Sequence, residues 1–412
     1  MVYFIYDLVI HCVAFLIGIV SRISDGKIRL FYRGRLHIFE KIESCLSGYQ
    51  GETIWMHCAS LGEFEQGRPV LETFRAKNPE VRIVLTFFSP SGYEVQKNYK
   101  GVDFVFYLPL DTYKNASRFV DLVAPCKVFF VKYEFWMNYL RVLEERNIPV
   151  YLFSALFRED QVFFKGYGFP FRKALKSFRH IFVQDSKSAE LLLKIGYQKI
   201  SVTGDTRFDR VNRIAIQAKR FPEIERFIGD SFCVVAGSTW VHDEILLMKF
   251  INECAFPIKY IIAPHEINAQ NLERLSQGIL KPLVFYSGIE KSPIEECQVL
   301  IIDNVGMLSS LYRYGKVAYV GGGFGKEGIH NCLEPAVFGI PVLFGPNYAK
   351  YREAVGLVSC GGGFPIHEYK DLSARLKTFY SQPEDRVKTG ALSAAFIQSE
   401  LGATEQILMQ SL

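Results

Sequence analysis

The sequence predicts an α/β protein built from two doubly wound parallel sheets, and three observations support this prediction. The chain has 412 residues, which at about 150 residues per domain suggests two domains. Hydrophobic residues make up 49% and charged residues 22% of the chain, a composition that can bury large cores and excludes a disordered or collagen-like protein. Short apolar runs alternate with amphipathic stretches, as in parallel sheets that helices cover on both faces.

Beyond residue 50, a first series of seven apolar, β-branched and aromatic runs indicates the strands of an N-terminal sheet. These runs are Thr53–Ser60, Val81–Ser89, Phe104–Leu110, Lys127–Glu134, Val150–Leu156, His180–Gln184 and Lys199–Thr203. A second series indicates a C-terminal sheet, with runs at Phe232–Gly237, Ile258–Pro264, Leu283–Tyr286, Val299–Asp303, Val317–Val320 and Pro341–Phe344.

A polar stretch from about Asp205 to Asp230 separates the two series. We therefore expect one domain over residues 22–209 and a second over residues 210–412, and the sequence leaves open that the last helix packs back on the N-terminal domain. A ligand is expected in a cleft between the two domains, at the carboxyl ends of the strands.

The first 21 residues are predicted to be a membrane anchor. Residues 2–20 form an apolar run of about the length of a spanning helix, although Asp7 and His11 interrupt it. Basic residues dominate the next segment, and such residues stay on the cytoplasmic side. The body of the protein should then lie at the cytoplasmic face of a membrane. An interfacial helix that does not span and a buried helix are the alternatives, and the absence of a small-residue cleavage site disfavours a signal peptide.

Composition also disfavours several kinds of site. The net charge is 48 − 43 = +5, which is too small to indicate a nucleic-acid partner. None of the nine cysteines forms a C-x-x-C pair, so a zinc knuckle or a thioredoxin-like site is disfavoured. There is no D-x-D triplet of the kind that bridges a metal and a sugar diphosphate. We expect no metal, no other cofactor and no nucleic acid.

The first motif that could carry chemistry is H-C-A-S-L-G-E-F-E at residues 57–65. A predicted strand runs into Ser60, Gly62 and the acidic Glu63, and Gly62 would let the backbone turn tightly. A carboxylate at such a strand-to-helix turn can act as a general base. Alternatively, Glu63 and Glu65 only complement the dipole of the following helix.

Two further motifs stand at predicted strand ends. The segment V-K-Y-E-F-W at residues 131–136 places Glu134 among aromatic residues, either in a site or as an ordinary acid at a helix start. In V-A-G-S-T-W-V-H-D-E at residues 235–244, Gly237 and Ser238 lead into a helix whose free N–H groups can bind phosphate. A simple Ser or Thr N-cap is the alternative.

The fourth motif is V-G-G-G-F-G-K-E-G-I-H-N-C-L-E-P-A at residues 320–336. A glycine-rich loop follows a strand, and a helix is predicted to begin near His330. Asn331 and Glu334 would share one face of its first turn, where a carboxylate can accept hydrogen bonds from both hydroxyls of a ribose. A glycine-rich turn without a ligand is the alternative.

Over nearly the whole chain, these motifs resemble those of the Kdo (3-deoxy-D-manno-octulosonic acid) transferases of lipopolysaccharide synthesis. The S-x-G-E-F turn of that family is present at residues 60–64, and its H-N-x-x-E-P-A helix start at residues 330–336. Its V-T-G-N-x-K-F-D segment is similar to residues 202–209, and its E-x-E-x-W segment to residues 132–136, where Lys132 replaces the first acid.

Two segments depart from the family pattern. The P-R-H-P-E-R stretch of the family is shortened to residues 264–267 and lacks its arginine, and the M-G-E element reads Val305-Gly306-Met307. Both changes concern expected contacts with CMP, and they suggest a divergent branch of the family.

The resemblance implies a GT-B fold and a membrane-associated glycosyltransferase at the cytoplasmic face of the bacterial inner membrane. The enzyme would move Kdo from CMP-Kdo to the lipid A precursor (lipid IVA), with inversion and without a metal. Glu63 would be the base that deprotonates the acceptor hydroxyl, and Glu134 and Arg207 would organise the transition state. The residues that the resemblance assigns to substrate binding are Ser60, Gly62, Gly237, Ser238, Pro264, His265, Val305, Gly306, Met307, His330, Asn331, Cys332, Leu333 and Glu334.

Two other functions stay open on the sequence: a GT-B transferase or epimerase that uses a UDP-sugar, and a non-catalytic, membrane-anchored nucleotide-binding protein. Residues 157–179 interleave six cations with aromatic side chains, among them Phe157, Phe163, Phe164, Tyr167, Phe169 and Phe171. This mixture predicts a second surface at the level of the lipid headgroups, with core packing of the aromatic residues as the alternative.

Overall fold

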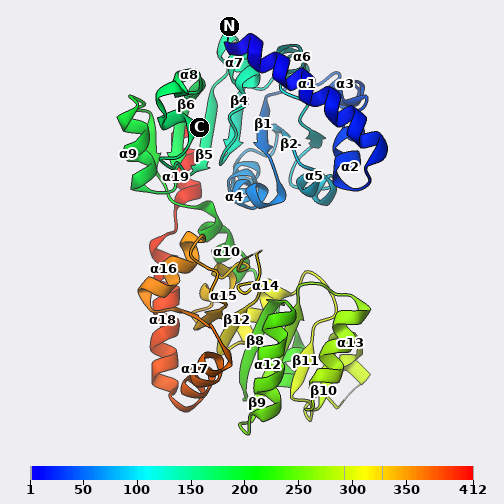
Figure 1. Cartoon of the computed structure of the whole chain (residues 1–412), viewed down its shortest axis with the longest axis vertical. Helices are drawn as coiled ribbons and strands as arrows, with labels where there is room; N and C mark the ends of the chain where they lie inside the picture. Colours follow the sequence, from blue (N-terminus) through cyan, green and yellow to red (C-terminus); the bar gives the residue numbers. More distant parts are fainter. Residues whose placement is uncertain (1, 292, 327, 412) are drawn as a thin grey trace. The chain divides into compact units, whose positions relative to one another are not determined.

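The computed structural model describes residues 2–291, 293–326 and 328–411, and it divides the chain into two compact units. Unit 1 comprises the residues up to Arg210 together with those from Leu401 onward, and unit 2 comprises Val211–Glu400. Each unit contains one seven-stranded, fully parallel sheet with helices packed against it (Figure 1). The two doubly wound α/β domains expected from the sequence are thus confirmed.

The sheet of unit 1 has the strand order β3-β2-β1-β4-β5-β6-β7. Its strands are β1 (Thr53–Cys58), β2 (Arg82–Phe87), β3 (Phe104–Tyr107), β4 (Lys127–Val131), β5 (Val150–Ala155), β6 (Phe178–Val183) and β7 (Ile200–Val202). The helices that follow β1 to β6 are α4 (Leu61–Lys77), α5 (Pro90–Gln96), α6 (Tyr113–Val123), α7 (Met137–Glu145), α8 (Phe169–Lys176) and α9 (Ser186–Lys194).

Side chains of β1 alternate between two buried layers, as strand geometry requires. Trp55 belongs to a core that includes residues of α6 and α7, whereas Ile54 and Met56 belong to a core on the other face, with Phe64 of α4. The C-terminal helix α19 (Ala403–Ser411) belongs to unit 1 and contributes Ile407 to the second core. Nearly continuous apolar strands arise because both faces of the sheet are covered.

The sheet of unit 2 has the order β10-β11-β9-β8-β12-β13-β14. Its strands are β8 (Phe232–Thr239), β9 (Ile258–Pro264), β10 (Leu283–Phe285), β11 (Val299–Ile301), β12 (Val317–Val320), β13 (Val342–Phe344) and β14 (Gly363–Pro365). Its α-helices are α11 (Pro222–Ile228), α12 (Val241–Glu253), α13 (Ala269–Gly278), α14 (Leu308–Leu311), α15 (Leu333–Ala336), α16 (Arg352–Cys360), α17 (Tyr369–Ser381) and α18 (Pro383–Ser399). The chain passes into this unit through α10 (Thr206–Ile216).

Strand β14 was not predicted. It has three residues, including Gly363 and Pro365, and lies at the edge of the sheet next to β13. Glycine and proline are depleted in strands, and proline is tolerated mainly at edges, so this sequence gives no strand signal. The other thirteen strands lie where the apolar runs predicted them.

Helix α1 (Val2–Ile23) is long and apolar enough to cross a membrane, and only a small share of it is buried. Short helices α2 (Lys27–Arg33) and α3 (Ile38–Leu46) connect it to β1. The first two turns of α1 are bound to the loop between β3 and α6 and to the start of α7. Tyr6 donates a hydrogen bond of 2.7 Å to Asp111, and Asp7 accepts bonds from the Tyr113 amide at 2.8 Å and the Asn138 side chain at 3.1 Å.

The prediction that residues 157–179 form a lipid-facing surface was wrong for most of the aromatic residues on which it rested. Phe157 and Phe163 are buried in the core of unit 1, and Phe164 and Phe171 pack against it. Only Tyr167 and Phe169 are well exposed. Phe163 and Phe164 lie in a short 3₁₀ turn at Val162–Phe164, and Phe171 lies in α8.

Candidate active site

The first predicted site residues lie where β1 ends and α4 begins, in unit 1. Ser60 is the N-cap of α4, and one oxygen of Glu63, Oε2, accepts a 2.9 Å hydrogen bond from the Ser60 amide and a 3.3 Å bond from its hydroxyl. The sequence left open that Glu63 only complements the dipole of α4; the structure shows that it closes a capping box with Ser60. This capping box occupies only Oε2, and within the part of the chain that the structure describes no group donates to Oε1. Glu63 can therefore cap α4 and still present one carboxylate oxygen to a substrate.

Gly62 does not have the role predicted for it. It lies in the first turn of α4, and a Cβ added there would meet no atom closer than 3.9 Å, the Ser60 Oγ. The backbone is not in the left-handed region that favours glycine, so the tight-turn interpretation was wrong. The missing side chain of Gly62 leaves open space near the Ser60 hydroxyl.

Electrostatics make Glu63 a stronger base than an ordinary glutamate. Partial burial, and then the negative charge of Glu134, raise the pKa of Glu63 above its usual value. Nearby His57, the Ser60 amide and Lys132 act in the opposite direction on the same pKa. Lys132, which replaces an acid of the family motif, follows β4 with a φ of 69°. A carboxyl group with a raised pKa in a site at strand ends is a candidate general base.

Glu134 is buried and held by two aromatic donors. The ring nitrogen Nε2 of His57 lies 2.9 Å from its Oε2, and the indole N–H of Trp136 donates to the same oxygen. On the other side of the imidazole, Nδ1 lies 2.8 Å from the Thr86 hydroxyl, which also accepts a 2.8 Å bond from Trp55. Because a carboxylate only accepts hydrogen bonds, His57 must carry its proton on Nε2, and Thr86 then donates to Nδ1.

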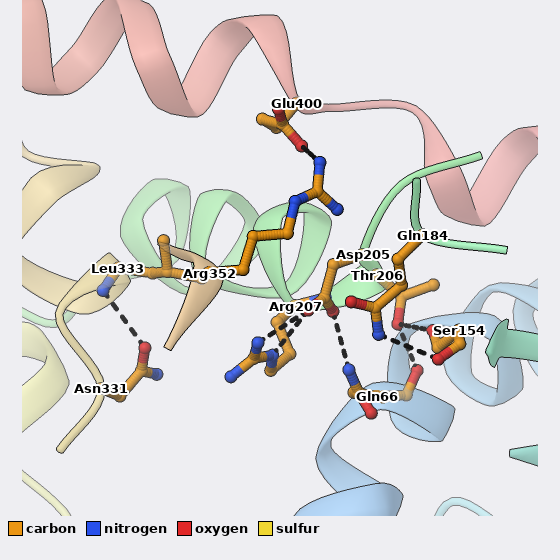
Figure 2. Close-up of polar contacts among 10 residues, drawn as sticks. All are labelled: Gln66, Ser154, Gln184, Asp205, Thr206, Arg207, Asn331, Leu333, Arg352 and Glu400. Atoms are coloured by element: carbon orange, nitrogen blue, oxygen red, sulfur yellow. Dashed lines mark hydrogen bonds and ion pairs between the residues drawn. The ribbon is translucent and has the colours of Figure 1, made fainter. Parts of the chain in front are cut away.

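Arg207 is part of a second polar network in unit 1, at the start of α10 (Figure 2). Its guanidinium donates from two nitrogens to Asp205 Oδ2, at 2.9 and 2.7 Å, and Gln66 of α4 donates to Asp205 Oδ1 at 3.1 Å. The hydroxyl of Thr206 donates to the Gln66 carbonyl at 2.6 Å. Arg207 lowers the pKa of the buried Asp205 although burial acts to raise it. This network holds α10 against α4.

In unit 2, several predicted binding residues follow the carboxyl ends of adjacent strands. Gly237 is close to the end of β8, and a Cβ there would lie 2.1 Å from the Tyr312 hydroxyl, so only glycine fits. Ser238 has a φ of 53°. Pro264 ends β9, and the amide of His265 donates to the Thr239 carbonyl at 2.9 Å. The strand order places these two ends side by side.

Three aromatic rings join the glycine-rich loop to these strand ends. The Trp240 ring stacks on His265 with a centroid distance of 4.6 Å, and His265 stacks on His330 at 4.4 Å. The indole N–H of Trp240 donates to His330 Nε2 at 2.8 Å. Burial lowers the pKa of His330 to about 4, so this imidazole is neutral and can accept that bond.

Asp243 of α12 holds the glycine-rich loop through hydrogen bonds. Its Oδ2 accepts 2.9 Å bonds from the amides of Gly322 and Trp240, and its Oδ1 accepts a 2.8 Å bond from the Tyr319 hydroxyl. Its carboxylate is thus fully occupied by structural hydrogen bonds.

The helix predicted to begin near His330 begins at Leu333 and has four residues. Asn331 lies just before it, and its side chain donates to Glu334 at 3.1 Å. The same side chain accepts a 3.2 Å bond from the Leu333 amide (Figure 2). The two side chains are therefore adjacent, as predicted, although they do not share a helical turn. The side chains of Cys332 and Leu333 are fully buried, so only their backbone can reach a ligand.

Residues 305–307 lie between β11 and α14. Val305 is exposed, Gly306 has a φ of 93°, and Met307 is buried in a core of unit 2. Met307 therefore has a packing role, and the backbone around Gly306 is the part that a ligand could contact.

Sequence reasoning missed four residues that position these groups. His57 and Thr86 support Glu134, while Asp243 and Trp240 support the glycine-rich loop. A polar residue inside an otherwise apolar strand is a usable signal for His57 and Thr86. Asp243 follows Trp240 by three residues, which is the spacing of a capping box. Over residues 2–291, 293–326 and 328–411, no group of three or more His, Cys, Asp or Glu side chains could hold a metal ion.

Comparison with known proteins decides the family. Residues 32–210 match the sequence profile of the family described as 3-deoxy-D-manno-octulosonic-acid transferase (kdotransferase). The 3-deoxy-D-manno-octulosonic acid transferase of Aquifex aeolicus is 29% identical over 335 residues, which cover 80% of this chain and 86% of that protein. The transferase of the same name from Haemophilus influenzae is 26% identical over 369 residues, 86% and 85% of the two chains. Residues 32–210 belong to the Kdo transferase family, and the two relatives extend the likeness over most of the chain.

As a Kdo transferase it is a glycosyltransferase, and its two parallel α/β domains are those of the GT-B fold. A solved structure with this architecture is the UDP-GlcNAc 2-epimerase from Neisseria meningitidis, with a TM-score of 0.61 and 14% identity. It covers 87% of this chain and 100% of the epimerase. At this identity the likeness concerns the fold alone.

Proposed function

We propose that this protein transfers Kdo from CMP-Kdo to the lipid A precursor lipid IVA, with inversion at the anomeric centre and without a metal. Membership of the Kdo transferase family supports the transfer of Kdo. The observation that supports the catalytic mechanism is the state of Glu63. One oxygen caps α4, no described residue donates to the other, and burial, together with the charge of Glu134, raises its pKa.

An alcohol is a weak nucleophile, so a transfer to a sugar hydroxyl needs a base near the attacking oxygen. Glu63 takes the proton from the acceptor hydroxyl as that oxygen attacks the anomeric carbon of Kdo. The bond from this carbon to the CMP phosphate breaks, and CMP leaves. Attack from the face opposite the phosphate inverts the anomeric centre. Glu134 is fixed by His57 and Trp136, and its negative charge raises the pKa of this base. Glu134 and Arg207 organise the transition state.

Unit 2 binds CMP-Kdo in this proposal. Glu334 and Asn331 face the ribose hydroxyls, and the backbone at Gly237, Ser238 and Gly306 accommodates the nucleotide. The leaving group is a phosphate monoester, which backbone amides and a cation can stabilise. No step then requires a metal, and activity should persist in a chelator.

The lipid acceptor places the enzyme at the cytoplasmic face of the bacterial inner membrane. The apolar helix α1 exposes Phe4, Leu8, Phe15 and Ile19, and these side chains suit the acyl region of a bilayer. Basic residues in and around α2 suit anionic headgroups.

The experiment that tests the proposal is mass spectrometry of lipid IVA incubated with CMP-Kdo and the purified protein. Kdo addition with release of CMP is expected, and excess CMP but not UDP should inhibit it. Transfer from a UDP-sugar instead would favour another GT-B activity. No transfer from either donor, with nucleotide binding retained, would favour a non-catalytic binding protein.

A further inference from the structure

An apolar pocket of about 510 Å³ lies between α1, α2 and the loop that follows β2, within unit 1. Eight of its ten lining residues are apolar, and Lys27 and Ser89 are the other two; the apolar ones are Val13, Leu16, Ile17, Val20, Ile28, Phe31, Phe88 and Pro90. Val13, Leu16, Val20 and Ile28 are also exposed. Apolar side chains that line a pocket and still face solvent point to an apolar ligand.

Two segments next to this pocket are tied to unit 1: the first turns of α1, ahead of the residues that line the pocket, and the end of α2. Helix α1 is tied to the domain by the bonds from Tyr6 to Asp111 and from Tyr113 and Asn138 to Asp7. The end of α2 is tied by Arg35, whose guanidinium donates to the Phe31 carbonyl at 3.0 Å and to the Phe88 carbonyl at 2.7 Å. The same guanidinium lies 3.8 Å from the centre of the Phe31 ring.

The pocket is one layer of side chains away from the catalytic carboxylates. The Phe88 ring contacts Phe31 on the pocket side, with a centroid distance of 5.1 Å, and Trp136 on the other side, at 4.6 Å. Trp136 in turn donates to Glu134. Next to Phe88, the amide of Ser89 donates to the Ala59 carbonyl at 2.7 Å, and Ala59 directly precedes Ser60, the cap of α4.

We propose that this pocket binds an acyl chain of the lipid acceptor and so orients its sugar toward Glu63. The inference rests on the proposed function, because it takes the acceptor to be a lipid. An acyl chain fits the apolar walls, and the cation of Lys27 at the pocket complements the phosphate of an acylated, phosphorylated sugar. The pocket thereby recognises the acceptor by its chain, whereas Glu63 acts on its hydroxyl. Helix α1 then lies along the membrane surface as part of a binding site.

The test compares two acceptors in the full-length protein: lipid IVA and the same bisphosphorylated disaccharide after complete deacylation. Leu16→Trp and Ile28→Trp place an indole in the pocket from opposite walls, and both positions are exposed, so folding should survive. Phe15→Trp is the matched control, because Phe15 is the exposed neighbour of Leu16 and does not line the pocket.

Each buried CH₂ contributes about fourfold in affinity, so loss of a few such contacts should raise the KM for lipid IVA by roughly tenfold or more. The kcat on lipid IVA and the kcat/KM on the deacylated acceptor should stay within about twofold of wild type, and Phe15→Trp should change neither. A lipid IVA analogue with a photoreactive group in one acyl chain should label residues 13–31 and 88–90 in wild type, and less in Leu16→Trp.

An unchanged KM for lipid IVA in both pocket variants, or photolabelling elsewhere, would overturn the inference. Labelling of the pocket by a photoreactive phosphatidylglycerol that lipid IVA does not displace would also overturn it, since the occupant would then be a bulk lipid. Failure of the proposed function looks different: the wild-type protein would add Kdo to neither acceptor, whatever the pocket binds.

Discussion

His57 and Glu134 form a buried pair, with 2.9 Å between the imidazole Nε2 and the carboxylate Oε2. Glu134 raises the pKa of Glu63, so the orientation of Glu134 affects the base although His57 touches no substrate. His57 is therefore a positioning residue. It fixes the carboxylate through one nitrogen and is itself fixed through the other, by Thr86.

His57→Phe should lower kcat by roughly 10- to 100-fold and leave the affinity for CMP unchanged. Loss of the hydrogen bonds at a buried carboxylate should also lower the free energy of unfolding by about 1–3 kcal/mol. His57→Gln keeps a donor and an acceptor and should restore part of the kcat. His180→Phe is the control, because His180 lies on β6, away from Glu134, and its ring is within hydrogen-bond distance of Ser201. If kcat fell equally in His57→Phe and His57→Gln, the role of His57 would be purely structural.

Glu63→Gln removes the base and retains the cap, since the amide oxygen can still accept from the Ser60 amide. Turnover should fall by a factor on the order of 10² to 10⁴, with thermal stability and CMP binding nearly unchanged. Steady-state transfer of Kdo and calorimetry with CMP measure the two effects. Normal turnover in this variant would remove Glu63 from the mechanism.

The pH dependence of transfer should report the ionisation of Glu63. A base must be deprotonated to act, so kcat/KM should rise with pH and level off above the pKa of Glu63, which burial and Glu134 raise above its usual value. Lys132 lowers that pKa, so Lys132→Gln should move the acid limb to higher pH. Lys165→Gln is the control, because Lys165 is a cation between the two 3₁₀ turns of unit 1. This variant should leave the acid limb of the pH profile at the wild-type position. A limb that does not move would show that another group controls it.

Glu334→Ala should weaken CMP binding by about 1–3 kcal/mol, because charge-assisted hydrogen bonds to the ribose would be lost. Calorimetry with CMP measures this directly. Glu384→Ala is the control, since Glu384 is an exposed acid in the first turn of α18. Unchanged affinity in Glu334→Ala would place the nucleotide elsewhere.

The sequence predicted the sheets well because strands such as β1 and β8 are covered on both faces and are therefore apolar throughout. It failed where three-dimensional partners decide the role. His57 and Glu134 are 77 residues apart, and Asp243 and Gly322 are 79 apart, so no local pattern links them. Gly62 was misread because a glycine before a helix suggests a turn, whereas here the helix has already begun. The role of Asp7 was missed because, in the sequence, Asp7 only interrupts an apolar run; its hydrogen-bond partners lie more than 100 residues away.

Asp7 gives the last prediction, which concerns how α1 is held. Its carboxylate accepts from the Tyr113 amide and from Asn138, so Asp7→Leu, although it makes α1 more apolar, should detach its first turns from the domain. The loss of two hydrogen bonds to a charged group should lower the free energy of unfolding by about 1–3 kcal/mol. Hydrogen exchange of residues 106–114 and 137–141 should accelerate, and transfer to lipid IVA should fall while CMP binding stays the same. Asp25→Leu is the control, because Asp25 is an exposed acid that pairs with Arg29 at the surface. If α1 were instead a free spanning anchor, Asp7→Leu would strengthen membrane association and leave the hydrogen exchange of both segments unchanged. Unchanged or slower exchange in residues 106–114 and 137–141 would therefore contradict a docked α1.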